Sequence, residues 1–243
     1  MDDFGRRTLG VIGGLGPLAT AFFLELVIDM TDAVRDQDHL DMVIFNTPSI
    51  PDRTRFILGD SQDNPVPPMV SVGRKLASLE VDFIAIPCIT AHAFYDVLSA
   101  CIDRPILHMV RETARHLQAC GVKSAGIAAT DGTRRAGLFQ KELDALGIRS
   151  VLPTDEGQRR IMELIYDDVK AGRPADLDKF SRVSNELRRD GAEAILLGCT
   201  ELSLIKRDAD IGHGYLDAME VLAAASVLAC GYPLKSRFRR LLS

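Results

Sequence analysis

Two cysteines stand directly after apolar stretches of the sequence. Cys88 ends the stretch FIAIPC and Cys199 ends AILLGC, and polar residues follow both. A side chain placed after a buried strand and before a helix faces the free N–H groups of the helix start, which favour a thiolate over a thiol. A thiolate can act as a base or a nucleophile, so both are functional candidates. Cys101, Cys120 and Cys230 fall within helical patterns, and we interpret them as small buried hydrophobes.

Polar side chains beside the two thiols could support them. Thr90 and Thr200 follow the cysteines closely and can cap a helix or donate a hydrogen bond to a ligand. His92 lies one helical turn after Cys88 and could tune its thiol. We interpret His92 instead as a residue that lines or supports a pocket, and we do not assign it a catalytic role.

A glycine-rich turn follows the first apolar stretch. Gly14, Gly16 and Ala19 fit the G-x-G-x-x-G/A pattern of dinucleotide-binding proteins. Such proteins also carry an acidic residue at the end of the second strand, where this sequence has Asn46 and Thr47. We therefore interpret the turn as a loop that approaches a small anion closely, in preference to a nucleotide site.

Two cationic residues could bind a carboxylate. Arg53 follows the second apolar stretch, where its guanidinium could hold a carboxylate through two hydrogen bonds, and a solvated loop arginine is an equally good interpretation. Lys170 lies in the last turn of a helical pattern that ends at Gly172. A cation there complements the helix dipole, and the local sequence alone favours that simpler interpretation.

The elements that must position these residues alternate along the chain. Short continuous apolar runs between amphipathic patterns predict an α/β fold with parallel sheets covered by helices on both faces. We expect strands at 8–14, 41–46, 82–88, 105–110, 124–130, 148–153 and 192–199. We expect helices at 19–34, 69–80, 91–102, 111–121, 138–147, 157–172, 175–191 and 217–230, and a loop over 47–68.

The two halves of the chain show a weak internal repeat. Gly10 aligns with Gly126, and a cysteine follows at a comparable distance in each half, Cys88 in the first and Cys199 in the second. We favour duplication over chance. Because ligands bind at the carboxyl ends of parallel strands, two similar lobes placed face to face would bring both thiols to one cleft.

Composition excludes several classes of protein. The chain has 243 residues, 47% hydrophobic and 26% charged, and a net charge of −5, which argues against nucleic acid or an anionic membrane as the main partner. The start of the sequence shows no apolar signal region, and no run is long enough to span a membrane. Five cysteines without C-x-x-C spacing indicate reduced thiols. We expect a cytoplasmic protein.

Five motifs, in order, resemble those of the PLP-independent aspartate/glutamate racemase family, most closely its aspartate racemase branch. They are GVIGGLGPLAT, FNTPSIPDRT, IPCITAH, IYDDVKAG and LLGCTEL. The resemblance runs from Leu9 to about Ala229. It implies two Rossmann-like lobes related by pseudo-twofold symmetry with the site between them, no cofactor, no metal and a homodimer. The implied lobes are 1–104 plus 211–243, and 105–210.

The resemblance also implies roles for individual residues. Cys88 and Cys199 match the two catalytic thiols, Arg53 matches the arginine that binds a substrate carboxylate, and Lys170 matches the lysine that serves the other acidic group. The further implied substrate-binding positions are Gly14, Leu15, Gly16, Asn46, Ile89, Thr90, Thr133 and Thr200. Two of these depart from the family pattern, since Ile89 replaces an asparagine that donates to the substrate carboxylate and Leu15 replaces a common methionine.

These features predict a cofactor-independent, two-base racemase of a small acidic amino acid, with aspartate expected first and glutamate next. Two bases are needed because one side chain does not reach both faces of a held carbon. Three alternatives stay open: a broad-specificity amino-acid or hydantoin racemase, a non-catalytic amino-acid-binding relative and a nucleotide-dependent oxidoreductase.

Overall fold

Two parallel sheets form the centre of the molecule. The computed structural model describes residues 5–243. Residues 1–4, to which the expectation of no apolar signal region partly applies, lie outside the described residues. One sheet has the order β2-β1-β3 and the other β5-β4-β6-β7, and every strand pairing is parallel. The strands are β1 (Leu9–Gly13), β2 (Met42–Asn46), β3 (Phe83–Ala85), β4 (Ser124–Ala129), β5 (Arg149–Val151), β6 (Ala194–Gly198) and β7 (Tyr215–Asp217).

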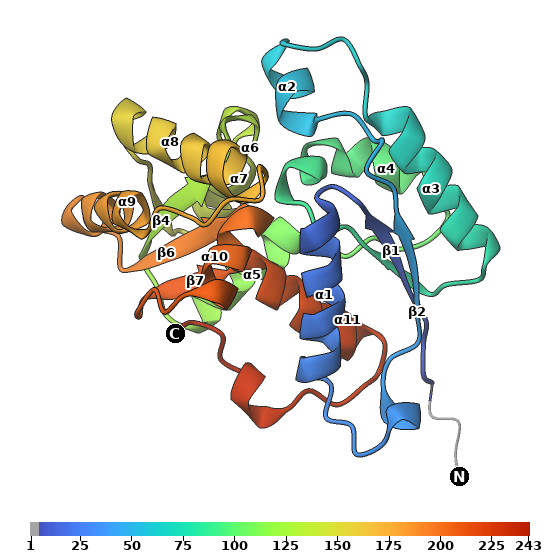
Figure 1. Cartoon of the computed structure of the whole chain (residues 1–243). Coiled ribbons are helices and arrows are strands. Elements are labelled where there is room, and N and C mark those ends of the chain that lie inside the picture. The colour runs from blue at the N-terminus through green and yellow to red at the C-terminus, as the bar shows by residue number, and fades with distance from the viewer. Residues whose placement is uncertain (1–4) are drawn as a thin grey trace.

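Helices cover both sheets, as Figure 1 shows. The α-helices are α1 (Pro17–Met30), α2 (Arg53–Leu58), α3 (Val66–Ser78), α4 (Tyr95–Cys101), α5 (Met109–Ala119), α6 (Asp131–Ala136), α7 (Leu138–Ala145), α8 (Asp155–Met162), α9 (Leu177–Arg189), α10 (Thr200–Asp208) and α11 (Ala218–Ala229). The 3₁₀-helices are η1 (Asp36–Asp38), η2 (Ile89–Phe94) and η4 (Ser236–Phe238), and η3 (Glu163–Val169) is a π-helix. The predicted α/β fold class is confirmed.

The two sheets repeat one design. Gly10 of β1 pairs with Ile84, four residues before Cys88, and Gly126 of β4 pairs with Ile195, four residues before the second thiol. Both glycines lie under the helix that precedes the cysteine strand. A Cβ on Gly10 would meet Leu76 of α3 at 3.2 Å, and one on Gly126 would meet Leu187 of α9 at 3.1 Å. The alignment of Gly10 with Gly126 therefore holds in three dimensions.

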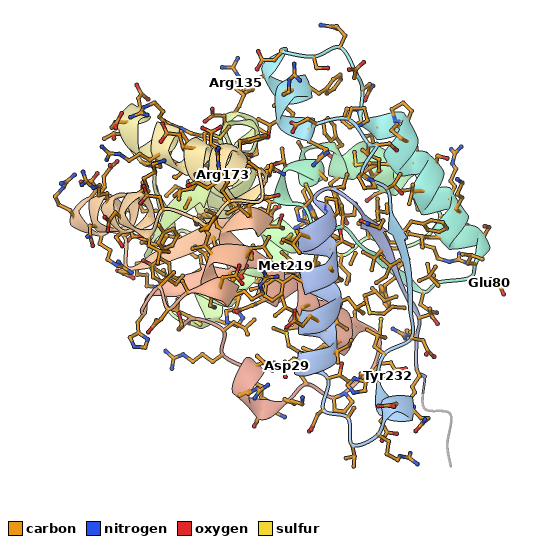
Figure 2. All side chains as sticks on the ribbon, in the orientation of Figure 1. Asp29, Glu80, Arg135, Arg173, Met219 and Tyr232 are labelled. Atoms are coloured by element: carbon orange, nitrogen blue, oxygen red, sulfur yellow. The ribbon has the colours of Figure 1, made fainter. Side chains whose placement is uncertain are left out.

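One apolar core joins the sheets. Helix α11 packs against α1 and α5 and also contacts β3 and β6. Met219, labelled in Figure 2, is fully buried in this core together with residues of both sheets. Within residues 5–243, no helix combines the length and hydropathy that a membrane span requires.

The structure differs from the sequence-based expectation at several places, among them the unpredicted helix α6 and three further features. The segment predicted as a loop over 47–68 contains α2, which is capped by Asp52 and packs on α6. The strand expected at 105–110 is wrong: only Ile106 forms a bridge, with Ile84, and α5 begins at Met109 after its cap His108. Strand β7 lies within 211–243, the segment assigned to the first lobe, yet it pairs with β6 of the second sheet.

Candidate active site

Cys88 and Cys199 lie at equivalent strand ends and line one cavity. Cys88 follows β3 and precedes η2, whereas Cys199 follows β6 and is the N-cap of α10. Both side chains are buried. Because the cavity takes residues that follow strands of both sheets, it is the place where the two halves of the fold meet.

Most of the predicted site residues gather at this cavity. Those that line it are Leu15, Arg53, Cys88, Ile89, Thr90, Lys170, Cys199 and Thr200. The cavity holds about 20 Å³, room for one water molecule. Gly14 and Gly16 line an adjoining groove of about 560 Å³, which shares Leu15, Arg53 and Lys170 with the cavity.

Two predicted residues lie outside the lining. Thr133 is fully buried behind the cavity, where its hydroxyl is 2.9 Å from that of Thr90 and bonds with that of Thr130 at 3.1 Å. Thr90 and Thr130 are also 3.0 Å apart, so three hydroxyls close a triangle between the turn after β3 and the turn after β4. Asn46 ends β2 as an exposed residue and lines neither the cavity nor the groove.

Arg53 is a buried cation with a donor to spare. Its terminal nitrogens donate to the carbonyls of Pro51 at 2.9 Å, Leu15 at 2.8 Å and Ile50 at 3.3 Å. Its Nε–H is buried and has no acceptor among residues 5–243. Because a guanidinium is a donor only, this Nε–H remains for an anion.

The charge of Arg53 is secured by its neighbours. Burial alone would lower the pKa of Arg53, but the attraction of Cys88 and Asp52 outweighs burial and raises it. Arg53 is therefore charged and stands beside Cys88, where it can stabilise either a thiolate or a carboxylate.

Lys170 forms an ion pair within the cavity with Glu201, which is not among the site residues predicted from the sequence. Its Nζ donates to Oε1 of Glu201 at 2.6 Å. Burial would lower the pKa of Lys170, but the Glu201 carboxylate and the Cys199 sulfur outweigh burial and raise it. Lys170 is therefore a charged lysine whose charge is already balanced.

Cys199 contacts the same carboxylate. Its thiol donates to Oε2 of Glu201 at 2.9 Å, and the hydroxyl of Thr200 donates to the same oxygen at 3.3 Å. Burial and the Glu201 carboxylate raise the pKa of Cys199 well above its usual value, although Lys170 opposes the shift. Burial and the carboxylate therefore oppose the effect that the start of α10 is expected to have on this thiol.

A hydrogen bond joins the two halves beside the cavity. The Tyr166 hydroxyl donates to Oδ2 of Asp52 at 3.2 Å. Tyr166 belongs to the π-helix η3, a rare conformation that often marks functional segments. Helices α2 and α6 also approach closely at the top of Figure 1, since a Cβ on Gly132 would lie 2.9 Å from Cα of Thr54.

His92 supports the turn that carries Cys88. Its Nδ1 lies 3.0 Å from the carbonyl oxygen of Cys88, and its Nε2 accepts the N–H of Met109 at 3.1 Å. The ring is therefore neutral with the proton on Nδ1, in agreement with a pKa that burial, together with His108, lowers to about 4. His92 connects the thiol turn to the start of α5 and does not line the cavity, so its predicted supporting role is confirmed.

Five further residues line the cavity: Asp52, Thr54, Thr130, Tyr166 and Glu201. Two of them carry a sequence signal. Tyr166 precedes Lys170 by four positions, which places both on one face of a helical segment. Glu201 follows Cys199 by two positions, in the first turn of a helix. Asp52 and Thr54 flank Arg53, but nothing local distinguishes them from other loop residues. Among residues 5–243, no group of three or more His, Cys, Asp or Glu side chains could hold a metal ion.

Comparison with known proteins identifies the family of this chain and several similar structures. The model of the Asp/Glu/Hydantoin racemase family matches residues 12–226. The fold is similar to that of Picrophilus torridus aspartate racemase, with a TM-score of 0.84 and 31% identity over 98% of this chain and 100% of that one. Broad specificity amino-acid racemase RacX of Bacillus subtilis is 27% identical over 223 residues, 90% of this chain and 96% of RacX.

A more distant structure shares the fold alone. Glutamate racemase from Francisella tularensis, solved with D-glutamate, has a TM-score of 0.68 and 16% identity over 93% of this chain and 81% of that one. The matched family model spans both sheets and both thiols. The chain therefore belongs to the Asp/Glu/hydantoin racemase family of isomerases.

Proposed function

We propose that this protein racemises a small amino acid by a two-base reaction between Cys88 and Cys199, with aspartate as the first expected substrate. The observation that carries the proposal is that both thiols, from equivalent strands of the two sheets, line one cavity. One thiolate removes the Cα proton, and the opposite thiol delivers a proton to the other face of the carbanion. The roles reverse for the other enantiomer.

Charge stabilisation at the α-carboxylate is the difficult part of the reaction. Removal of the Cα proton places negative charge on the carboxylate oxygens, and a preorganised cation lowers the cost of that charge. Arg53 is buried, lines the same cavity as Cys88 and has an Nε–H without an acceptor among residues 5–243, so it suits this position. Its carbonyl partners hold the guanidinium in place before a substrate arrives.

The second cation supports an acidic substrate. Lys170 lines the same cavity as Arg53, and a diacid could place one carboxylate on each. The relative that shares 31% of its residues with this chain is an aspartate racemase, which also supports aspartate.

One observation favours a second candidate, a broad-specificity racemase. Lys170 is already paired with Glu201, and the apolar side chains of Leu15 and Ile89 line the cavity. Such a lining would accept uncharged side chains, and the similarity to RacX supports the same reading. The two candidates differ only in the substrate, not in the thiol chemistry.

The test is a chiral assay in D₂O with a panel of L- and D-amino acids, among them aspartate, glutamate, alanine and methionine. The proposed function requires interconversion of enantiomers with incorporation of deuterium at Cα. Cys88→Ala and Cys199→Ala should each abolish interconversion. Turnover of either variant at the parent rate would exclude the two-base reaction, and a panel without any exchange would exclude racemisation of these substrates.

A further inference from the structure

The two thiols occupy equivalent positions but have different surroundings. Cys88 is followed by Ile89 and Thr90, which carry no charge, whereas Cys199 is followed by Thr200 and Glu201. The register places Glu201 at the position equivalent to Thr90, two residues after the thiol. At this equivalent position, a carboxylate follows one thiol and a hydroxyl side chain follows the other.

A cation lies near each of the two thiols. Arg53 and Cys88 line the same cavity, and although burial lowers the pKa of Arg53, their mutual attraction raises it. Cys88 thus faces a cation, which stabilises a thiolate. The cation near Cys199 is Lys170, and its charge is balanced by Glu201 at 2.6 Å. Lys170 also attracts Cys88, and Asp52 lines the cavity and attracts Arg53. The feature that distinguishes the two sulfurs is therefore the direct contact of Cys199 with the Glu201 carboxylate.

The Glu201 side chain is held where it can accept a hydrogen bond from the Cys199 thiol but cannot donate one. Its side chain is 5% exposed, and Oε1 is occupied by the Lys170 ammonium. Oε2 accepts the S–H of Cys199 at 2.9 Å. An ionised carboxylate has no proton to donate, so the contact is attractive only when the proton is on Cys199. Lys170, at 2.6 Å from Oε1, balances the charge of this carboxylate.

We propose, on the basis of the racemase function proposed above, that Glu201 is a positioning residue that keeps the proton of the resting enzyme on Cys199 and leaves Cys88 as the thiolate. Cys88 then takes the Cα proton of the enantiomer that presents it, and Cys199 gives its own proton to the opposite face of the carbanion. The product leaves Cys88 as a thiol and Cys199 as a thiolate.

The enzyme returns to its resting form between turnovers. Cys88 loses its proton to solvent and Cys199 gains one, and the Glu201 carboxylate drives this exchange because it faces the Cys199 thiolate unfavourably. For the other enantiomer, the minor form with the thiolate on Cys199 reacts first. Glu201 therefore decides which of the two protonation forms predominates when the site is empty.

The test measures alkylation of each cysteine by iodoacetamide as a function of pH, with the modified peptides quantified by mass spectrometry. The pH midpoint is the informative quantity, because both thiols share the burial that limits the absolute rate. The proteins compared are the wild type, Glu201→Gln and the matched control Glu220→Gln. Glu220 also pairs with a lysine, Lys206, at 2.8 Å, but it lies outside the cavity.

In the wild type, Cys88 should be alkylated with a lower pH midpoint than Cys199. Glu201→Gln should lower the midpoint of Cys199 by about one to three units, since a neighbouring carboxylate is removed. Glu220→Gln should leave both midpoints unchanged. An unchanged Cys199 midpoint in folded Glu201→Gln, or a wild type in which Cys199 reacts at the lower pH, would overturn the proposal.

A second variant keeps the test decisive if Glu201→Gln does not fold. Lys170→Gln removes the balancing cation and leaves the carboxylate, so the Cys199 midpoint should rise, and a fall would contradict the proposal. The alkylation assay needs no turnover, so it is independent of the racemase assay. If the protein racemises amino acids but the alkylation midpoints differ from those predicted, only the role of Glu201 is overturned. If the midpoints are as predicted but no amino acid is racemised, the proposed function is overturned and the proton arrangement at the two thiols is supported.

Discussion

The hydroxyl of Tyr166 donates to Oδ2 of Asp52 at 3.2 Å and connects the π-helix η3 with the cap of α2 beside the thiol cavity. The cavity of about 20 Å³ is far smaller than an amino acid. We therefore expect one of the segments around the cavity to move when a substrate reaches the thiols from the adjoining groove. The bond between Tyr166 and Asp52 lies where such a movement would separate the two halves.

Tyr166→Phe should therefore make the site open more readily. Loss of a part-buried hydrogen bond to a carboxylate should shift the equilibrium between the closed and open site by about 1 kcal/mol, which corresponds to roughly fivefold. The expected result is a roughly fivefold faster alkylation of both thiols at fixed pH, with unchanged pH midpoints. Tyr95→Phe is the control, because the Tyr95 hydroxyl donates to the carbonyl of Ile106 away from the cavity. Equal rates in Tyr166→Phe and the wild type would show that this bond does not limit access.

Ile89→Asn restores the side chain that the family pattern carries after the first thiol. Ile89 is buried and lines the cavity, so an amide there could donate to a substrate carboxylate. We expect kcat/KM for aspartate to rise about tenfold, since a hydrogen bond to a charged group contributes about 1.5 kcal/mol. Because Ile89 also packs in the main core, the midpoint of thermal unfolding should fall. Ile89→Val is the control for the packing change, and an Ile89→Asn variant without any gain on aspartate would favour the broad-specificity candidate.

Gly16→Ala should disturb the carboxylate that holds Cys199. The backbone of Gly16 is extended, with φ of −114°, so alanine meets no conformational strain. Its Cβ would nevertheless lie 3.1 Å from Oε1 of Glu201, the oxygen that accepts from Lys170. The pH midpoint of Cys199 alkylation should shift in the same direction as in Glu201→Gln, but less. The double variant Gly16→Ala/Glu201→Gln should show no shift beyond that of Glu201→Gln, and an additive shift would mean that the two residues act independently.

Much of the fold follows from the sequence, because buried parallel strands are continuous apolar runs and several helices end at a glycine with positive φ. The thiols belong to this predictable part, since a residue after such a strand must lie at the carboxyl edge of its sheet. Helix α2 does not, because six residues form a stable helix only through packing on α6. In the stretch at 105–110, Ile106 bridges to Ile84 and Met109 and Val110 already begin α5. Hydrophobicity alone does not distinguish this arrangement from a strand.

The charge arrangement of the site was less predictable than its position. Lys170 and Arg53 are visible in the motifs, but the pairing of Lys170 with Glu201 depends on how η3 lies across α10. The same holds for Thr130, which reaches Thr90 only because the two halves meet. Contacts between distant segments carry no periodic signal in the sequence, and they set which of the predicted residues are free to bind a substrate.

Asp217 gives a prediction for stability that is separate from catalysis. Its carboxyl is fully buried at the start of α11, where Oδ1 accepts from Ser203 at 2.7 Å and from the N–H of Met219 at 2.8 Å. Oδ2 has no partner within the described chain. Burial, together with the carboxylate of Glu220, raises the pKa of Asp217 to about 7, and Ser203 and Lys206 oppose the shift.

The sign of the pH effect follows from this raised pKa. An unfolded aspartate ionises near pH 4, so between about pH 4 and 7 the folded protein holds the extra proton and its free energy of unfolding falls as the pH rises. Asp217→Asn keeps the acceptor Oδ1 and has no charge, so its free energy of unfolding should not fall in this way. Above pH 7 this free energy should exceed that of the wild type by about 2 kcal/mol or more. Urea unfolding at pH 5 and pH 8 measures the difference, with the exposed Asp103→Asn as control. The prediction would be contradicted if the difference in free energy of unfolding between Asp217→Asn and the wild type were the same at pH 8 as at pH 5.

Each thiol turn is completed by the opposite half of the molecule. Thr90, after β3, meets the hydroxyls of Thr130 and Thr133 after β4, and Glu201, after β6, lies against Gly16 after β1. Fragments of this chain, each containing one sheet, would consequently be inert when separate, however well either folded. Activity in such a split enzyme would depend on the concentration of both pieces, as it does for a site shared between subunits.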